Sequence, residues 1–455
     1  MERVLKKRKL KPGFKIILGF LAIITIGALL LHLPIATIDH EQVPFIDCLF
    51  TSASAVCVTG LTIFPPGLTF SSFGQTVLLI LIQLGGLGFM TATSMVLFII
   101  GKKFSLHDRM AISSSFGEEG LHGVIRLMRN AVIVTFSVET LGSILLSFRF
   151  IPQFGFSKGI WYSVFHSVSA FCNAGFDVLN VTDNLASYSS DPLVALTICG
   201  LIIMGGLGFL VVIELTKRMS RIDKKRTLIS MHTKVVLSVT AILIFGGMFL
   251  FCLFEWNNEG TLGNMNTGDK LLNGFFQSVT TRTAGFSTIN QDKMLSASKL
   301  LSMILMVIGA SPAGTGGGFK TTTLAVMFAL FISVIRGKRN VSLFKRSISK
   351  QTVNRSLALI LMMLAGVITL SVALCAIEGP KFTMDELMFE VCSAFGTVGL
   401  SCGITGGLTS ASKILLILAM FFGRVGMLSI LTGVNEQFSK NNSDMQYPEG
   451  KILIG

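Results

Sequence analysis

The chain has 455 residues, of which 51% are hydrophobic and 14% are charged, and its formal net charge is +14. Soluble domains carry about a quarter charged residues, so the composition excludes an ordinary soluble protein and indicates a polytopic membrane protein. The positive charge does not predict a nucleic-acid partner, because the Lys and Arg residues lie between apolar runs, as in the cytoplasmic loops of membrane proteins.

The first part of the chain has an order of segments that recurs. A basic arm over residues 1–15, suited to anionic membrane lipid, precedes an apolar run over 16–33 that is long enough to span a bilayer. An acidic loop leads to a shorter apolar segment with Ser and Thr over 45–58, and a second long run covers 75–100. We expect two transmembrane helices with a short helix between them.

The same order of long run, short segment and long run occurs three more times. The long runs cover 131–148, 193–213, 235–254, residues from 300 onward, 357–377 and 414–431, and the short segments cover 161–172, 271–281 and residues up to 395. This order divides the chain into four expected repeats, namely 1–120, 121–230, 231–350 and 351–455.

Basic loops recur once per repeat, and they determine the expected topology. Since loops rich in Lys and Arg stay in the cytoplasm, each repeat must cross the membrane an even number of times. The two long runs therefore cross, and the short segment enters and returns on the outer side. The sequence predicts an all-α polytopic protein of the cell membrane, with eight transmembrane helices, four re-entrant pore helices and both termini in the cytoplasm.

A glycine turn follows each short segment, and successive glycines are spaced by 110 to 115 residues. The turns are Val58-Thr59-Gly60, Asn173-Ala174-Gly175, Thr283-Ala284-Gly285 and Thr397-Val398-Gly399. Glycine lets the chain leave a helix with unusual backbone angles, and re-entrant backbone is tolerated where it lines a cavity. Around one axis, the four turns would form a selectivity filter in which carbonyls of the four glycines bind a dehydrated K⁺ ion.

Two identical Gly-Gly-Leu-Gly-Phe boxes, at 85–89 and 205–209, lie within the second long run of the first two repeats. Glycine inside a membrane helix permits either a bend or a close approach of a neighbouring helix. We expect close packing to be the role of both boxes.

The third repeat has a longer glycine-rich stretch instead, Gly309-Ala310-Ser311-Pro312-Ala313-Gly314-Thr315-Gly316-Gly317-Gly318. Pro and clustered Gly break a helix. The stretch therefore predicts a gate below the turns, with a kink that has no gating role as the alternative. It is not a phosphate-binding loop, which needs Gly directly before Lys, because Phe319 separates Gly318 from Lys320.

Two ionisable residues lie inside long apolar runs. Arg424 takes the position of the second glycine of the box in the fourth repeat, and an Arg inside a span must face a wet cavity or a partner. We expect it to be a barrier below the filter that pairs with carbonyls of the loop at 310–318, with a structural salt bridge as the alternative. Glu139 is interpreted as a partner in helix packing rather than a pathway residue.

With these turns, boxes, the glycine-rich break and Arg424, the chain resembles the Trk/Ktr/HKT superfamily of potassium transporters, and within it the membrane subunit of a bacterial Ktr-type system. The resemblance implies four pseudo-symmetric repeats around one pore, a homodimer, and a cytosolic ring of RCK-type subunits that bind ATP or ADP and open the gate. It also implies stimulation by Na⁺. It assigns the four glycines to the filter, 310–318 to the intramembrane gating loop and Arg424 to the pore arginine.

The function predicted is gated, channel-like K⁺ uptake driven by the membrane potential, with no enzyme activity, no covalent cofactor and nucleotide bound only by a partner subunit. Only the fourth turn reads Thr-Val-Gly, so a less selective or sodium-preferring cation channel is the alternative. A coupled permease would favour several carboxylates within the spans, and an intramembrane enzyme would need a paired nucleophile and base. The sequence has neither pattern.

Overall fold

The computed structural model describes residues 12–88, 124–179, 184–219, 229–338 and 340–426. These ranges are almost entirely helical, and their only β-ladder is the two-residue antiparallel hairpin of β1 (Ser342–Leu343) and β2 (Arg346–Ser347). Three parts of the predicted segments lie outside the described residues. They are residues 1–11 of the basic arm, 89–100 of the run at 75–100 and 427–431 of the run at 414–431.

The helices follow the predicted order of long and short segments. They are α1 (Pro12–Leu31), α2 (Phe45–Val56), α3 (Pro66–Thr69), α4 (Ser72–Leu87), α7 (Val124–Phe154), α8 (Phe156–Phe171), α9 (Pro192–Gly206), α10 (Phe209–Met219), α11 (Met231–Glu255), α12 (Thr267–Thr280), α13 (Ser296–Val307), α14 (Thr321–Ile335), α15 (Lys350–Glu378), α16 (Met384–Gly396) and α17 (Ser410–Val425). Short 3₁₀ turns occur at Pro34–Ala36, Asn184–Tyr188, Gly379–Lys381 and Thr405–Gly407.

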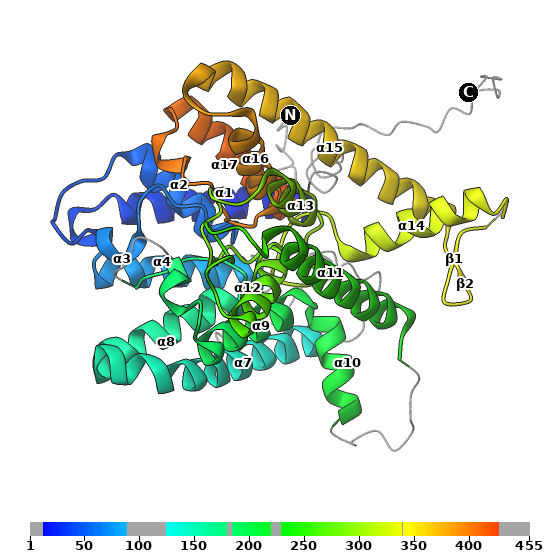
Figure 1. Ribbon diagram of the computed structural model, residues 1–455, viewed down its shortest axis with the longest axis horizontal. Helices are drawn as coiled ribbons and strands as arrows, with labels where there is room; N and C mark the ends of the chain where they lie inside the picture. The colour runs from blue at the N-terminus through cyan, green and yellow to red at the C-terminus, as the bar shows by residue number, and fades with distance from the viewer. Residues whose placement is uncertain (1–11, 89–123, 180–183, 220–228, 339, 427–455) are drawn as a thin grey trace, which may run out of the picture.

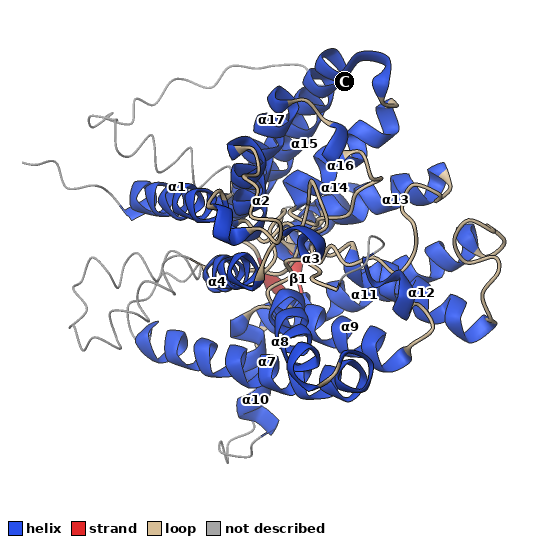
Figure 2. Ribbon diagram, turned by 90° about the vertical axis from the view of Figure 1, so that its left-hand side faces the viewer, coloured by secondary structure: helices blue, strands red, loops and turns tan. Residues whose placement is uncertain are grey.

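The outer layer consists of long apolar helices, and the connecting loops gather at the centre of the molecule (Figure 1, Figure 2). Among the described residues, the helices over Met128–Phe154, Met231–Glu255 and Lys350–Lys381 are long and apolar enough to cross a membrane, and a fourth span results if α9 and α10 are counted as one. Less than half of each long segment is buried within the protein. Large side chains such as Phe148 and Phe245 face outward, as expected for contact with lipid.

Each short helix packs against the long helix that precedes it: α2 on α1, α8 on α7, α12 on α11 and α16 on α15. In the first three pairs, a glycine of the long helix faces a serine of the short one, and the serine hydroxyl donates to the carbonyl three residues before that glycine. These sets are Gly27–Ser52–Ile24, Gly142–Ser167–Glu139 and Gly247–Ser278–Ile244, with hydrogen bonds of 2.7, 2.6 and 2.7 Å. Glycine permits this close contact between helices.

The contacts between successive groups of helices close a ring. The second helix of each group packs on the short helix of the next: α4 on α8, α9 on α12, α13 on α16 and α17 on α2. A polar contact joins each pair of neighbouring groups: Trp161 Nε1 to Gln75 Oε1 (2.7 Å), Asn273 Nδ2 to the Ser189 carbonyl (2.8 Å), Lys299 Nζ to Asp385 (3.8 Å) and Lys413 Nζ to Asp47 (2.7 Å). The first and last groups are therefore neighbours in space.

The long run at 193–213 is not one straight helix. It is divided into α9 and α10, whose axes differ by 103°. The bend lies at the second glycine box, where Gly208 has a φ of +88° and the Phe209 amide donates to the carbonyl of Ala313. The second box therefore serves both roles considered for it: Gly205 packs closely against the Phe171 carbonyl, and the helix bends at Gly208, where another loop of the chain inserts.

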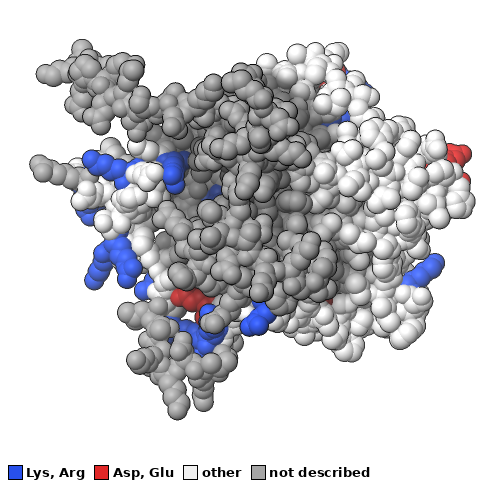
Figure 3. Space-filling view, turned by 180° about the vertical axis from the view of Figure 1, so that it is seen from behind, with Lys and Arg blue, Asp and Glu red and all other residues white. Residues whose placement is uncertain are grey.

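Charged residues gather at one end of the molecule. The β1–β2 hairpin and the end of α14 lie at the right of Figure 1, which corresponds to the left edge of Figure 3, where Lys and Arg side chains are concentrated. Arg336, Lys338, Lys345 and Arg346 are all exposed in this part of the chain. Most of the described surface on the opposite side of Figure 3 is uncharged.

The ring closure can be tested at its last contact. Lys413 and Asp47 lie 2.7 Å apart, and their side chains are only 10% and 15% exposed. Replacing Lys413 with Met leaves the Asp47 carboxylate without its partner, which should destabilise the protein by on the order of 3 kcal/mol. We expect a lower melting midpoint of the detergent-solubilised protein, partly restored by adding Asp47→Asn. The same change at the exposed Lys158 is the control, and equal midpoints for both lysine variants would contradict the prediction.

Candidate functional site

The four glycine turns share an unusual backbone geometry. The residue two before each glycine and the glycine itself both have positive φ: Val58 (55°) and Gly60 (97°), Asn173 (60°) and Gly175 (67°), Thr283 (67°) and Gly285 (81°), and Thr397 (50°) and Gly399 (92°). Left-handed angles are rare for β-branched residues such as Val58 and Thr283, and each costs about 1–3 kcal/mol. Such strain persists only where the surrounding structure holds it in place.

The turns meet at the centre of the ring of helices. A Cβ atom added to Gly60 would lie 2.5 Å from the carbonyl oxygen of Ala174, and one added to Gly175 would lie 2.6 Å from that of Ala284. In the same way, Gly285 abuts the carbonyl of Val398, and Gly399 abuts that of Thr59. Each glycine thus faces the carbonyl that precedes the glycine of the next turn, so the four turns follow one another in a closed circle.

Hydroxyl groups of the short helices hold these turns in two ways. In the first and fourth turns, the amides of Gly60 and Gly399 donate to Ser54 Oγ and Ser393 Oγ, both at 3.0 Å. In the other two turns, the hydroxyl donates to the carbonyl that follows the glycine: Ser169 to Phe176 at 2.9 Å and Thr280 to Phe286 at 2.5 Å. The glycine carbonyls are thereby left free of these side-chain bonds.

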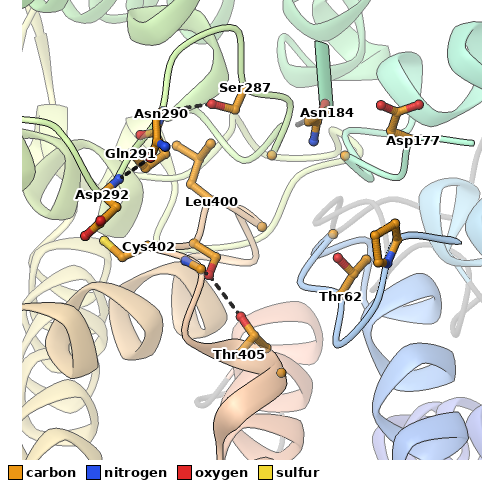
Figure 4. Close-up of a pocket in the computed structure, with 18 of the residues that line it drawn as sticks. Thr62, Asp177, Asn184, Ser287, Asn290, Gln291, Asp292, Leu400, Cys402 and Thr405 are labelled. Carbon is orange, nitrogen blue, oxygen red and sulfur yellow. Dashed lines mark hydrogen bonds between the residues drawn. The ribbon is translucent and has the colours of Figure 1, made fainter. Parts of the chain in front are cut away.

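A cavity of about 700 Å³ lies against one side of the circle and is lined by all four glycines (Figure 4). Its wall is built from the chain segments that leave the turns, which contribute Thr62, Asp177, Ser287 and Thr405 among other residues. Asp177 and Asp292 are its carboxylates and Lys293 its cationic residue among the described lining residues, and the remaining polar groups are amides and hydroxyls. This lining suits a hydrated cation better than an anion. We call this cavity the vestibule.

The glycine-rich stretch forms an irregular loop on the other side of the circle, between α13 and α14. The loop is fastened to the second glycine box: the Ser311 amide donates to the Gly206 carbonyl (3.0 Å) and the Thr315 amide to that of Gly205 (3.2 Å). The Gly317 amide donates to Thr397 Oγ1 at 3.1 Å. The loop therefore lies against the residues where the turns begin, whereas the vestibule lies where they end.

Arg424, near the end of α17, ties this loop to the first group of helices. Its Nη1 donates to the Thr315 carbonyl, and its Nη2 donates to the carbonyls of Gly85 and Gly86, the latter at 3.3 Å. The described residues provide no carboxylate within ion-pair distance of it. Lys320 adds a second cation, with Nζ 2.8 Å from the Gly316 carbonyl. Two positive charges held by carbonyls alone would oppose the passage of a cation.

Glu139 lies behind the second turn, where its Oε1 is 3.9 Å from the Sγ of Cys172, the residue before Asn173. It is buried in α7, where Oε2 accepts a hydrogen bond from Gln83 of α4 at 3.3 Å and its backbone carbonyl accepts one from Ser167 of α8. Glu139 therefore joins three packed helices.

The structure brings together all the residues predicted for the site. The residues of the four turns form the circle, 309–318 form the loop next to it, and Arg424 contacts that loop. The sequence analysis missed Lys320 and the hydroxyls that hold the turns. Ser54, Ser169 and Ser393 each lie six residues before their glycine, and this regular spacing was the available signal.

Lipid-facing helices around a central circle of four turns define a polytopic membrane protein with the features of an ion pathway. Residues 8–444 match the TrkH family, described as cation transport proteins. The chain is 39% identical to the Ktr system potassium uptake protein B of Bacillus subtilis, over all of this chain and 99% of that protein. It is also 39% identical to the potassium/sodium uptake protein NtpJ of Enterococcus hirae, over 99% of this chain and all of that protein.

The fold has a counterpart among solved structures. The crystal structure of the potassium transporter TrkH from Vibrio parahaemolyticus matches with a TM-score of 0.70 at 14% identity, covering 95% of this chain and 86% of that one. The chain belongs to the TrkH/Ktr family of cation transport proteins, and the predicted family is confirmed.

The contacts of Arg424 lead to a prediction for the loop. Replacing Arg424 with Ala removes both a positive charge and the hydrogen bonds that hold Thr315, so cation flux should rise. A loss of 1.4 kcal/mol from the barrier corresponds to about a tenfold rise in rate. Rubidium uptake into proteoliposomes, normalised to folded protein, measures this. Arg149→Ala, which removes an arginine from an exposed ion pair with Asp191, is the control, and unchanged flux in folded Arg424→Ala would rule out a barrier role.

Proposed function

We propose that the protein takes up K⁺ through a pore along the axis of the four turns, driven by the membrane potential. The observation that carries this proposal is the closed circle, in which each glycine faces a carbonyl of the next turn. Carbonyl oxygens replace the hydration shell of an ion in such filters, which offsets the cost of a bare charge in the membrane. The names of the relatives support potassium as the ion.

The short helices add to the attraction for a cation. α2, α8, α12 and α16 each end one to three residues before the first residue of a turn of the circle, so their C-terminal ends point toward it. The C-terminal end of a helix carries a partial negative charge. These ends favour a cation over an anion in the filter.

In the proposed mechanism, the loop at 309–318 and Arg424 form the gate. The pathway opens when the loop moves away from Thr397 and Arg424 leaves the Thr315 carbonyl. The loop groups that lose a hydrogen bond in this movement are backbone amides and carbonyls. Water in the open pore can replace these hydrogen bonds. Loop residues therefore need no new protein partner in the open state.

The arrangement in the membrane is also part of the proposal. Four repeats, 1–120, 121–230, 231–350 and 351–455, would cross the membrane eight times, with the vestibule outside and both termini in the cytoplasm. The exposed basic residues around the β1–β2 hairpin support a cytoplasmic position for that end. A homodimer controlled by a cytosolic RCK-type ring that binds ATP or ADP is the proposed assembly. One relative is named as a component of a Ktr system, which supports a partner subunit.

A second candidate function is a less selective or sodium-preferring cation channel, whereas stimulation of K⁺ uptake by Na⁺ belongs to the first. Two observations favour the second candidate. The four turns differ in sequence, since only Thr397-Val398-Gly399 has the Thr-Val-Gly order, and one relative is named a potassium/sodium uptake protein. Competition of Na⁺ with rubidium uptake separates the two candidates.

Gly399→Ser tests the filter. Gly399 has a φ of +92° and abuts the carbonyl of Thr59, so a side chain there must displace the neighbouring turn. We expect at least about a tenfold loss of K⁺ affinity or of preference over Na⁺, corresponding to roughly 1.4 kcal/mol. Uptake in potassium-starved cells and in proteoliposomes measures both.

The matched control is Gly200→Ser, because Gly200 is exposed on α9 with open space around it. Wild-type affinity and selectivity in folded Gly399→Ser would remove this glycine from the filter. Wild-type protein that carries no rubidium in proteoliposomes would overturn the proposed function as a whole.

A further inference from the structure

Two of the short helices carry a buried ionisable side chain at the same position. His166 lies nine residues before Gly175, and Glu390 lies nine residues before Gly399. Both are fully buried. Each is bonded to the residue two after its glycine, which is Asp177 in the second turn and Ser401 in the fourth. Each therefore connects a short helix to the chain segment that follows the turn. We call this segment, which forms part of the vestibule wall, the outer leg.

The second turn shows how firmly such a contact holds. His166 Nε2 lies 2.8 Å from Asp177 Oδ1, and His166 Nδ1 lies 2.8 Å from the Tyr162 carbonyl. Since the carbonyl can only accept, Nδ1 donates, and a proton must be shared between Nε2 and Asp177. The Leu179 amide also donates to Asp177 Oδ1, at 2.6 Å. The outer leg of this turn is thus held by a buried, hydrogen-bonded His–Asp pair.

Glu390 makes a larger set of contacts in the fourth turn. Its Oε1 accepts a hydrogen bond from the Ser401 hydroxyl, and the Thr405 hydroxyl lies 3.2 Å from both carboxylate oxygens. No Lys, Arg or His among the described residues lies within ion-pair distance of it. A buried carboxylate without a cation depends on such donors, because each lost hydrogen bond exposes it to the full cost of desolvation. Ser401 and Thr405 are therefore held strongly.

The other two turns are built differently. In the third, Gln277 and Gln291 pair through their amides at 2.7 and 3.1 Å, and Gln291 also donates to Ser287. In the first, the corresponding Thr51 donates only to the Asp47 carbonyl of its own helix, at 2.8 Å. Thr51 is as buried as Glu390 but does not reach an outer leg, so it provides a matched control.

We propose that Glu390 is a positioning residue that holds the outer leg of the fourth turn and thereby determines how strongly the pore prefers K⁺ over Na⁺. The inference rests on the proposed function. Ser401 is two residues from Gly399, and the leg from 400 to 405 is continuous with the turn, so movement of the leg moves the glycine carbonyl. K⁺ and Na⁺ differ little in size, and selection between them depends on the placement of such carbonyls.

The first experiment measures the position of the leg without transport. Cys402 lies between the two residues bonded to Glu390, is 7% exposed and lines the vestibule. We expect Glu390→Gln, Glu390→Val and Ser401→Ala to raise the rate at which a bulky maleimide labels Cys402 in purified protein by about fivefold or more, because the leg opens locally. Thr51→Val should leave the rate unchanged, and Cys402→Ser gives the background from the other cysteines.

The second experiment measures selectivity in the same variants. Inhibition of rubidium uptake by Na⁺ should strengthen about fivefold or more in Glu390→Val and Ser401→Ala, corresponding to roughly 1 kcal/mol. Glu390→Gln should show a smaller shift, since its remaining carbonyl accepts one hydroxyl. A merely structural role would lower the maximal rate through loss of folded protein, with sodium inhibition unchanged. Ser401→Ala leaves the short helix intact, so it remains informative if Glu390→Val does not fold.

The outcomes separate the two proposals. Unchanged labelling of Cys402 in folded variants overturns the positioning role, whatever the protein transports. Faster labelling with unchanged sodium inhibition also overturns it, because the leg then moves without effect on selectivity. Faster labelling in a protein whose wild type carries no rubidium contradicts the proposed function, and with it the link to selectivity, while leaving the structural contact established.

Discussion

The structure depends on irregular backbone held at the centre of an apolar protein. The four turns and the loop at 309–318 leave helical geometry where lipid offers no hydrogen bonds, so every amide and carbonyl there needs a partner from the protein, from water or from an ion. Hydroxyls of the short helices satisfy part of this need, as Ser54 does for the Gly60 amide. The glycine carbonyls that remain are the groups proposed to bind K⁺.

The same constraint explains why the site consists of backbone rather than side chains. Each glycine abuts a carbonyl of the next turn so closely that a Cβ atom cannot be accommodated, and each has a positive φ. Side-chain chemistry is used around the circle instead: hydroxyls and buried ionisable residues such as His166 hold the turns from behind, and Arg424 and Lys320 bind the loop through its carbonyls. Rigidity of the surroundings is what gives a circle of peptide groups a defined size.

The four groups of helices are similar but not equivalent, and they differ at the loop and the arginine that are proposed to form the gate. Within the described ranges, the group with α13 and α14 is the one with a long break in its second helix, and the loop formed there inserts at the bend between α9 and α10. Arg424 reaches both this loop and the first group. The loop therefore contacts the second and fourth groups directly and is linked to the first through Arg424, so its movement would be felt around the whole circle.

The sequence by itself determined the features that depend on local chemistry. Lengths of apolar runs predicted the long and short helices, and Gly60, Gly175, Gly285 and Gly399 were found because positive φ favours glycine at a fixed place in each group. Only the tertiary structure decided which groups meet across the circle: Lys413 with Asp47 and Arg424 with Gly85. It also revealed the bend at Gly208, where the loop at 309–318 inserts. These contacts join residues that no local pattern relates, because their proximity arises only when the first and last helices close the ring.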